Sequence, residues 1–488
     1  MRWRRGCVKK RANLVQASLR SDGLEVAVLC ETQIPHHRFD PHCLKVPPFA
    51  EPGNGKGVWQ FLSLTCSAAI GFAEEETMQV MIERGCGLDV HQATVVACLL
   101  TQMPNGRCKK QIRTFSTTTR ELIALRAWLQ AEGCTHVGME STGVYWKPVY
   151  AILEGAFELV IANAQHIKRV PGRKTDVKDA EWIADLLVHG LMKASFVPPP
   201  AIRELRDLTR YRRKLVESQS AERNRLLKVL ETANIKLASV ASDVFGVSGQ
   251  LMVAALVAGE ATPAAMAELA KGRLREKLPQ LELALAGKVE EHHRYLLRLQ
   301  LKRLQAVEED LAQLEAHLQE KLEPYREQEA RLREIPGVDS TLAAIIIAEL
   351  GVDMSVFPSA SKIAAWAGVS PGNHESAGKR RSGRVTKGNV YLKTALVEAA
   401  FAASRKKGSY LREKFYRLKA RRGHKRAAVA IAHKILTAVY HMLGQQVPYH
   451  ELGDLYLDQL NQQNLTRNLV RRLQRLGYNV TLERTVAA

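Results

Sequence analysis

The chain has 488 residues, enough for two to four domains, and its 46% hydrophobic and 25% charged residues are typical of globular domains that bury cores. Lys and Arg outnumber Asp and Glu by 71 to 50, so the net charge of +21 indicates a polyanionic partner, either nucleic acid or an anionic membrane. All eight cysteines lie at or before Cys134 without a C-x-x-C pair, which indicates neither a disulfide framework nor a zinc module.

The positive charge is concentrated in one part of the chain. Residues 371 to 426 carry 17 Lys or Arg against three Glu. No apolar run of the roughly 18 residues that a membrane-spanning helix needs accompanies this tract. The distribution therefore favours nucleic acid over a membrane as the partner.

Residues 1–77 differ from the rest of the chain. They join a basic start, MRWRRGCVKKRA, to a Pro- and His-rich piece and a weakly apolar piece, with no sustained period of 2 or 3.6 residues. The apolar piece is internal and is followed by EEE, which disfavours a signal peptide. We expect an unassigned leader here, and a natural start at Met78 or Met81.

From residue 82 the pattern becomes regular. Segments rich in β-branched residues predict three strands, at IERGCGLDV, ATVVACLLTQ and KKQIRTFST. A helix at TTRELIALRAWLQAEG, a strand at THVGMES, a helix at GVYWKPVYAILEGA and a strand at FELVIAN follow, and a last helix covers TDVKDAEWIADLLVHGLM. This order, β-β-β-α-β-α-β-α, is that of the ribonuclease H fold, so we expect an α/β domain with a mixed sheet over residues 82–195.

Four acidic residues fall at the ends of these predicted elements. Asp89 lies near the end of the first strand and Glu140 near the end of the fourth, which are neighbours in the expected fold. Asp176 and Asp179 are three apart at the start of the last helix and so share one face. Each of them alone could be a turn or helix-capping residue. Together they predict a metal site, because clustered carboxylates need cations to stay ionised.

Carboxylate oxygens suit Mg²⁺. A pair of such ions about 4 Å apart can hold the attacking and leaving oxygens of a phosphodiester. The four acids therefore predict a magnesium site, with two ions, that acts on a phosphodiester.

These residues carry a family resemblance. GLDVHQATVVACLL, MESTGVYWKPVYAILEG and the stretch from IANAQHIKRVPG through KTDVKDAEWIADLL resemble the three blocks of the DEDD transposases of the insertion-sequence 110 family, whose N-terminal domain is similar to the RuvC Holliday-junction resolvases. The stretch from IPGVDSTLAAIIIAELG through NVYLKTALVEAAF resembles that family's C-terminal transposase domain. The resemblance implies a RuvC-like DEDD domain over 82–195, a serine transposase domain over 334–445 and a tail over 446–488.

Long helices are expected between the two domains, over residues 200–333. In the second of them Leu297, Leu304, Leu311, Leu318 and Tyr325 recur every seven residues, the pattern of a coiled-coil seam. A spacer and dimerisation arm is favoured over direct nucleic-acid binding. The resemblance agrees, since such a coiled coil joins protomers in the family, and it implies a homo-oligomer, either a dimer or a tetramer.

The segment LREIPGVDSTLAAIIIAEL predicts a helix-hairpin-helix in a mostly α-helical C-terminal domain. Gly337 would let the backbone turn tightly and would expose amide groups near the next helix, where a DNA phosphate could bind. A plain helical turn is the alternative. The neighbouring basic tract favours DNA binding.

The stretch SPGNHESAGKRRSGRVTKGN contains three serines, Ser370, Ser376 and Ser382, in a basic loop without apolar anchors. A neutral hydroxyl is a weak nucleophile unless it is activated, so composition leaves all three open as ordinary loop residues or nucleophiles. The family pattern, P-G and then S-x-G before a basic G-x-x-x-K-G-N, selects Ser376. Many members have glycine directly after the serine, whereas here Ala377 lies between Ser376 and Gly378.

By the resemblance, the acidic site would activate the scissile phosphate and Ser376 would attack it to form a phosphoserine. Four cations would neutralise the added charge and hold the DNA strand: Arg380, Arg381, Arg384 and Lys387. The broken bond's energy is then kept in the serine ester, so rejoining needs no ATP.

No base-reading element is visible in the sequence. The resemblance implies instead that a structured noncoding RNA pairs with donor and target DNA, in a cytoplasmic, nucleoid-associated protein. Two alternatives stay open. A structure-specific nuclease or Holliday-junction resolvase would need the four acids and Mg²⁺ but not Ser376, and an inactive scaffold would need neither.

Overall fold

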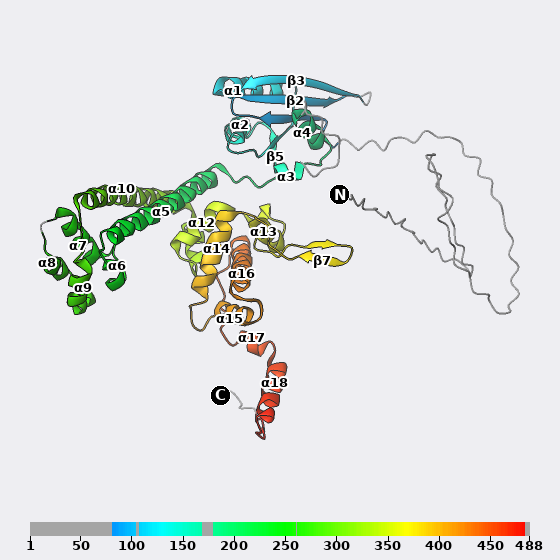
Figure 1. Cartoon of the computed structure of the whole chain (residues 1–488). Coiled ribbons are helices and arrows are strands. Elements are labelled where there is room, and N and C mark those ends of the chain that lie inside the picture. Colours follow the sequence, from blue (N-terminus) through cyan, green and yellow to red (C-terminus); the bar gives the residue numbers. More distant parts are fainter. Residues whose placement is uncertain (1–80, 104–106, 168–178, 260, 484–488) are drawn as a thin grey trace, which may run out of the picture. The chain divides into compact units, whose positions relative to one another are not determined.

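The computed structural model describes residues 81–483, apart from 104–106, 168–178 and 260 (Figure 1). The predicted leader, 1–77, lies outside the described residues, and so does Asp176. A five-stranded sheet with helices comes first along the chain, followed by a pair of long helices and then a mostly helical C-terminal region. The exact domain boundaries stay a prediction.

The sheet follows the predicted order of elements. Its strands are β1 (Arg84–Val90), β2 (Thr94–Gln102), β3 (Cys108–Ser116), β4 (His136–Glu140) and β5 (Glu158–Ala162), arranged β3-β2-β1-β4-β5. β1 and β2, like β2 and β3, are antiparallel, whereas β1 with β4 and β4 with β5 are parallel. This mixed sheet is compatible with the ribonuclease H-like arrangement expected from the sequence.

Helices cover both faces of this sheet. They are α1 (Thr119–Ala131), α2 (Trp146–Leu153), the short α3 (Ala164–Ile167) and α4 (Asp179–Val188). Leu88 and the alternate residues of β1 pack in one core with α1 and α2, whereas Gly85 and Gly87 point to α4 on the other side. Alternate residues of a strand point to opposite faces, so the central strand β1 is covered on both sides.

Helix α4 lies directly on the backbone of β1. A Cβ atom on Gly87 would lie 2.2 Å from the backbone nitrogen of Ala184 and 2.3 Å from the carbonyl oxygen of Ala180. Gly138 is paired with Gly87 across β1 and β4, and a Cβ there would lie 2.9 Å from the sulfur of Met192. The absence of side chains at this pair lets the helix approach the sheet closely.

Replacing Gly87 with Ala should therefore destabilise this region, by about 3 kcal/mol in the free energy of unfolding, because backbone atoms of α4 must move to admit the methyl group. Urea titration followed by circular dichroism measures the change. Gly85→Ala is the matched control, since its Cβ would meet side-chain atoms and no backbone, the nearest being a methyl group of Val188 at 2.9 Å. Equal losses in the two variants would contradict the close approach at Gly87.

Two long helices, α5 (Pro200–Thr232) and α10 (Glu291–Leu322), form an antiparallel hairpin. Their direction follows from three ion pairs along their length, Lys321 with Glu204, Arg212 with Glu315 and Arg223 with Glu308. The chain between them forms short helices: α6 (Leu237–Val240), α7 (Val247–Ala258), α8 (Pro263–Glu268), the 3₁₀ helix η1 (Gly272–Lys277) and α9 (Leu278–Leu285). These helices share a separate core with the end of α5 and the start of α10.

The seam predicted from the heptad pattern is buried within one chain. Leu297, Leu304, Leu311 and Leu318 are each at most 8% exposed. The prediction is wrong for Tyr325, which lies beyond the end of α10 in a 3₁₀ turn and is half-buried. Their helix packs against α5, which contributes its own buried leucines Leu205, Leu215, Leu226 and Leu230. Within this chain the seam therefore packs α10 against α5. A role of the arm in joining protomers stays a prediction.

The C-terminal region is mostly helical. Its helices are η2 (Glu323–Tyr325), α11 (Arg326–Arg333), α12 (Ser340–Leu350), η3 (Met354–Val356), α13 (Ala360–Ala367), α14 (Val390–Ala403), α15 (Tyr410–Arg422), α16 (His424–Gln445), α17 (Tyr456–Gln459) and α18 (Gln462–Arg475). A two-stranded hairpin, β6 (His374–Ser376) and β7 (Lys379–Ser382), lies between α13 and α14. The predicted tail thus contains two helices.

Helix α16 corrects the expectation that no membrane-length apolar segment accompanies the basic tract. By length and composition alone it could cross a membrane, although half of its apolar stretch is buried within the protein. It packs against α13, α14 and α15, and its buried residues belong to the main core of this region. The packing is that of a core helix.

A buried carboxylate joins α5, α12 and the start of α14. Glu349 is fully buried, and both of its oxygens accept hydrogen bonds from the Arg210 guanidinium, at 2.8 and 2.9 Å. The Asn389 amide donates to it at 2.6 Å, and Arg206 Nε lies 3.3 Å away. Asn389 also caps α14 by accepting from the backbone N–H groups of Tyr391 and Leu392. One carboxylate therefore ties three elements together.

Glu349→Gln should lower the free energy of unfolding by about 3–5 kcal/mol, because it leaves two partly buried guanidinium groups without a counter-charge. Urea titration is the measurement. Glu315→Gln is the control, since Glu315 pairs with Arg212 at the exposed surface, where ion pairs contribute little. If Glu349→Gln cost no more than Glu315→Gln, the buried pair would not stabilise the fold.

Candidate functional site

Three of the four predicted acids come together at one edge of the sheet. β1 and β4 are parallel and Leu88 is paired with Met139, so the next residues, Asp89 and Glu140, are neighbours. Asp179 is the first residue of α4, the helix that lies on the face opened by Gly87. The fourth acid, Asp176, lies outside the described residues.

The electrostatics of Asp89 reflect this convergence. Burial is the largest cause that raises the pKa of Asp89, and the negative charges of Asp179 and Glu140 raise it further against the opposing influence of His91. The ionised form of Asp89 is therefore disfavoured in the protein alone. A divalent cation would reverse that balance, so these carboxylates fit a site for a hard metal ion such as Mg²⁺.

Two further side chains orient the acids. His91 Nε2 lies 3.1 Å from an oxygen of Asp89, and the Thr142 hydroxyl donates to Glu140 at 2.8 Å. Each partner is two residues downstream of its acid. Sequence reasoning missed both residues, and their spacing from the acids was the only available signal. Such outer partners hold ligating carboxylates in place.

Replacing Asp89 with Asn should raise the melting temperature in EDTA, by roughly 1–3 °C. The raised pKa of Asp89 means that its contribution to stability falls as pH rises through that pKa, so at neutral pH the carboxylate is a net cost that Asn removes. The same variant should lose most of the stabilisation that Mg²⁺ gives the wild type.

Differential scanning fluorimetry at pH 8, with EDTA or Mg²⁺, measures both effects. Glu83→Gln is the control, because Glu83 is an exposed acid just before β1 and removes the same charge away from the site. An unchanged Mg²⁺ response in Asp89→Asn would contradict a metal site at Asp89.

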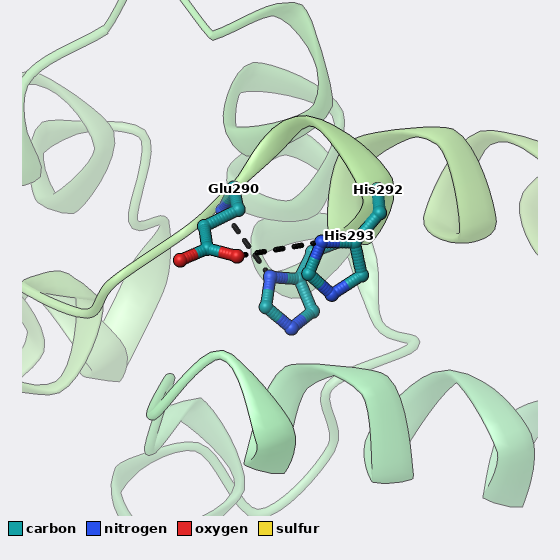
Figure 2. A group of neighbouring side chains, drawn as sticks. All are labelled: Glu290, His292 and His293. Carbon is teal, nitrogen blue, oxygen red and sulfur yellow. Dashed lines mark hydrogen bonds and ion pairs between the residues drawn. The ribbon is translucent and has the colours of Figure 1, made fainter.

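A second group of potential ligands lies at the start of α10. Glu290, His292 and His293 place one ligand atom each within 4.8 Å of one another (Figure 2). Glu290 and His293 form a capping box, in which the Glu290 side chain accepts from the His293 backbone and His293 Nδ1 accepts from the Glu290 backbone N–H at 3.2 Å. Helix capping explains why Glu290 and His293 lie close together, so their proximity does not by itself indicate a metal site.

Ser376 lies on the β6–β7 hairpin and not in an irregular loop as the sequence suggested. The strands are joined by Ala377 and Gly378, both with positive φ, 52° and 72°, as in a type I′ turn. Ser376 is exposed directly before this turn. The sequence did not predict the hairpin because its strands are short and polar. In addition, Ala377 has a left-handed backbone conformation, which is less favourable by about 1–2 kcal/mol for a residue other than glycine.

The other two serines have local environments that suit structural roles. The Ser382 hydroxyl accepts a hydrogen bond from the Arg384 backbone N–H at 3.2 Å, which shapes the turn after β7. Ser370 is half-buried, and its backbone N–H donates to the carbonyl oxygen of Ala364 at the end of α13. Ser376 is the serine that the hairpin presents to solvent.

Cations surround this hairpin. Arg381, Arg384 and Lys387 are exposed, and no carboxylate within the described ranges pairs with them. Arg380 lies on β7, opposite Glu375. The end of the segment is anchored, because a Cβ on Gly388 would lie 2.4 Å from the backbone of Gly368, and Asn389 follows at once.

Gly337 lies in the turn between α11 and α12, with a φ of 89°. A Cβ there would lie 2.3 Å from the carbonyl oxygen of Ala399 in α14, so packing alone requires glycine. The Asp339 side chain already caps α12 by accepting from the Leu342 N–H at 2.8 Å. Phosphate binding at this turn stays a prediction.

The structure brings Asp89, Glu140 and Asp179 together at one edge of the sheet, and Ser376 lies on the β6–β7 hairpin of the C-terminal region. The two groups also fall in different matched segments. A family model described as a transposase of the DEDD, IS110 type matches residues 86–235, and one described as the transposase IS116/IS110/IS902 family matches residues 329–417.

Several known proteins are similar to this chain over most of their length. A probable family 20 transposase of Pseudomonas aeruginosa is 26% identical over 320 residues, which cover 64% of this chain and 85% of that protein. The transposase for insertion sequence element IS1111A of Coxiella burnetii is 27% identical over 299 residues, 59% and 72% of the two chains. An uncharacterized 42 kDa protein of insertion element IS900 from Mycobacterium paratuberculosis is 27% identical over 329 residues, 60% and 80%.

Proposed function

This chain belongs to the IS116/IS110/IS902 family of transposases, and on that premise we propose that it cuts and rejoins DNA strands through a phosphoserine intermediate on Ser376. The observation that carries the proposal is the convergence of Asp89, Glu140 and Asp179 at the edge of the sheet. A protein that only binds DNA would not need three mutually repelling carboxylates in one place.

Asp89, Glu140 and Asp179, with Asp176, would hold two Mg²⁺ ions. When bound, the ions supply positive charge that polarises the scissile phosphate. His91 and Thr142 keep the carboxylates of Asp89 and Glu140 in position through their hydrogen bonds. The raised pKa of Asp89 fits this role, because burial and the neighbouring negative charges disfavour its carboxylate form and a bound cation would favour it.

The Ser376 hydroxyl would attack the phosphorus of the DNA backbone. A bond forms between Ser376 Oγ and phosphorus, and the bond from phosphorus to the leaving deoxyribose oxygen breaks. The serine hydroxyl loses its proton, and the leaving oxygen gains one. A deoxyribose hydroxyl of the strand to be joined then attacks the phosphoserine and releases Ser376, so the number of phosphodiester bonds is conserved without ATP.

The cations of the hairpin would act on the same phosphate. Arg381, Arg384 and Lys387 are exposed within the eleven residues that follow Ser376, and Arg380 lies on β7, opposite Glu375 of β6. Their charges would stabilise the extra negative charge that develops at phosphorus and would hold the DNA strand. The turn at Gly337 would bind a further DNA phosphate.

A structured guide RNA and further protomers are proposed partners. The net charge of +21 suits a large polyanionic partner, and the sequence contains no obvious base-reading element. Since the acids and Ser376 lie in separate groups, we propose that they meet when DNA, RNA and the protomers of a dimer or tetramer assemble. The proposal places the protein in the cytoplasm, with the nucleoid.

One observation favours a second candidate, a structure-specific nuclease or Holliday-junction resolvase. The elements that bring the acids together, β1, β4 and α4, all belong to the sheet domain, so Ser376 is not needed to form the acidic site. Such a site could hydrolyse DNA with water as the nucleophile. Serine dependence separates the two candidates.

In the deciding experiment the full chain is incubated with Mg²⁺, DNA that contains the element ends and RNA transcribed from the flanking sequence. Denaturing gels then detect protein bound covalently to DNA. The wild type should form this adduct, whereas Ser376→Ala and Asp89→Asn should each reduce it by at least roughly a thousandfold, since each removes an essential group.

Ser382→Ala is the matched control, because Ser382 is an exposed serine of the same hairpin whose hydroxyl serves the local turn. It should keep the adduct. Strand cleavage that persists in Ser376→Ala without an adduct would establish the nuclease. A wild type that cleaves no DNA under these conditions would support an inactive scaffold.

A further inference from the structure

A cavity of about 390 Å³ lies in the C-terminal region, between α15 and the residues in and just after α17. It is lined by Lys414, Arg417, Arg421, Leu457 and Asn461. The three cations are at positions i, i+3 and i+7 of α15 and therefore lie on one face of that helix. None of these residues belongs to the acidic site or to the Ser376 hairpin.

Positive charge exceeds negative charge at this cavity. Lys434 of α16 adds a fourth cation, close enough to act on Lys414. Burial first, and then the charges of Lys434, Arg421 and Arg417, lower the pKa of Lys414. Lys414 is half-buried, whereas Arg421 and Lys434 are exposed. Like charges held this close are unfavourable unless an anion joins them.

One carboxylate offsets this group. Asp458 of α17 pairs with Arg417 at 2.7 Å. Lys414, Arg421 and Lys434 have no carboxylate partner in the part of the chain that the structure describes. The charge imbalance is therefore centred on these three side chains, and Asn461 can donate further hydrogen bonds into the cavity.

Resting on the proposed function, we propose that this α15 cation pocket, lined by Lys414, Arg417, Arg421 and Asn461 with Lys434 of α16 beside Lys414, binds a phosphate group of a nucleic-acid backbone through residues outside the acidic site and the Ser376 hairpin. A phosphodiester supplies the negative charge and the acceptor oxygens that the pocket lacks. Such a contact reads no sequence and fixes the position of the strand on the protein.

The surroundings favour a nucleic-acid strand over a small free anion. Lys419 and Arg422 of α15 and Lys425 and Arg426 of α16 are also exposed, so the pocket lies within a continuous basic stretch of two consecutive helices. A polymer with regularly spaced phosphates can contact several of these cations at once, whereas a single ion cannot. DNA and RNA share this chemistry, and the experiment distinguishes them.

The parent protein in this test is the full chain with Ser376→Ala, so that no covalent adduct contributes to binding. Two variants of this parent are compared, each with two further substitutions. Lys414→Gln with Arg421→Gln removes two cations of the pocket and leaves the pair of Arg417 and Asp458 intact. Arg298→Gln with Lys302→Gln removes the same charge from exposed positions of α10, outside the cavity and outside the basic stretch of α15 and α16.

Fluorescence anisotropy gives the affinity for a labelled DNA duplex and for a labelled structured RNA over a series of KCl concentrations. The pocket variant should bind at least about tenfold more weakly near 0.1 M salt, with the slope of log affinity against log salt reduced by about two. The control should lose much less. A loss confined to DNA or to RNA identifies the strand that occupies the pocket.

Thermal unfolding checks that the pocket variant is folded. Its melting temperature should equal or exceed that of its parent, because repulsion among the cations is relieved. Equal losses of affinity in the two double variants would reduce the effect to net charge and overturn the proposal. Unchanged salt slopes for both DNA and RNA would also overturn it, since a pocket for a free anion alone behaves in that way.

Discussion

The buried carboxylate of Glu349 is the interaction on which the arrangement of the C-terminal region depends. It accepts from Arg210 of α5 and from Asn389 at the start of α14, while it belongs to α12 itself. Burying a charge is unfavourable unless every partner is in place, so the three elements can adopt few other arrangements. The Ser376 hairpin ends a few residues before Asn389. The nucleophile candidate is thereby held at one end by the same cluster that fixes the long helix α5.

The acidic site of the sheet domain depends instead on the absence of side chains at two glycines. Gly87 and Gly138 let α4 lie against the sheet, and Asp179 at the start of that helix comes within electrostatic range of Asp89. Close packing of the backbone stabilises this region, whereas the repulsion among the acids destabilises the site when no cation is bound. Neighbouring residues of β1 therefore have opposite effects on stability: Gly87 permits close packing, and Asp89 adds repulsion.

Much of the fold and part of the site follow from the sequence. Strand and helix order, the strand ends that carry Asp89 and Glu140, and the buried leucines of α10 are all visible as local periodicity, and the structure confirms them. The partner of those leucines is not visible, because a heptad pattern does not specify which helix fills the seam. The polar hairpin at Ser376 and the carboxylate partners His91 and Thr142 could not be predicted from the sequence either, since single polar residues carry no periodic signal.

The closed seam of α5 and α10 has a consequence for how the protein is assembled. A chain whose leucine seam needed a second protomer would be stable only where protomers were concentrated. Here the seam is completed by the chain itself, and its leucines are already buried. Folding of the arm is then a unimolecular event, independent of protein concentration. The buried seam of the arm therefore needs no second protomer to be complete.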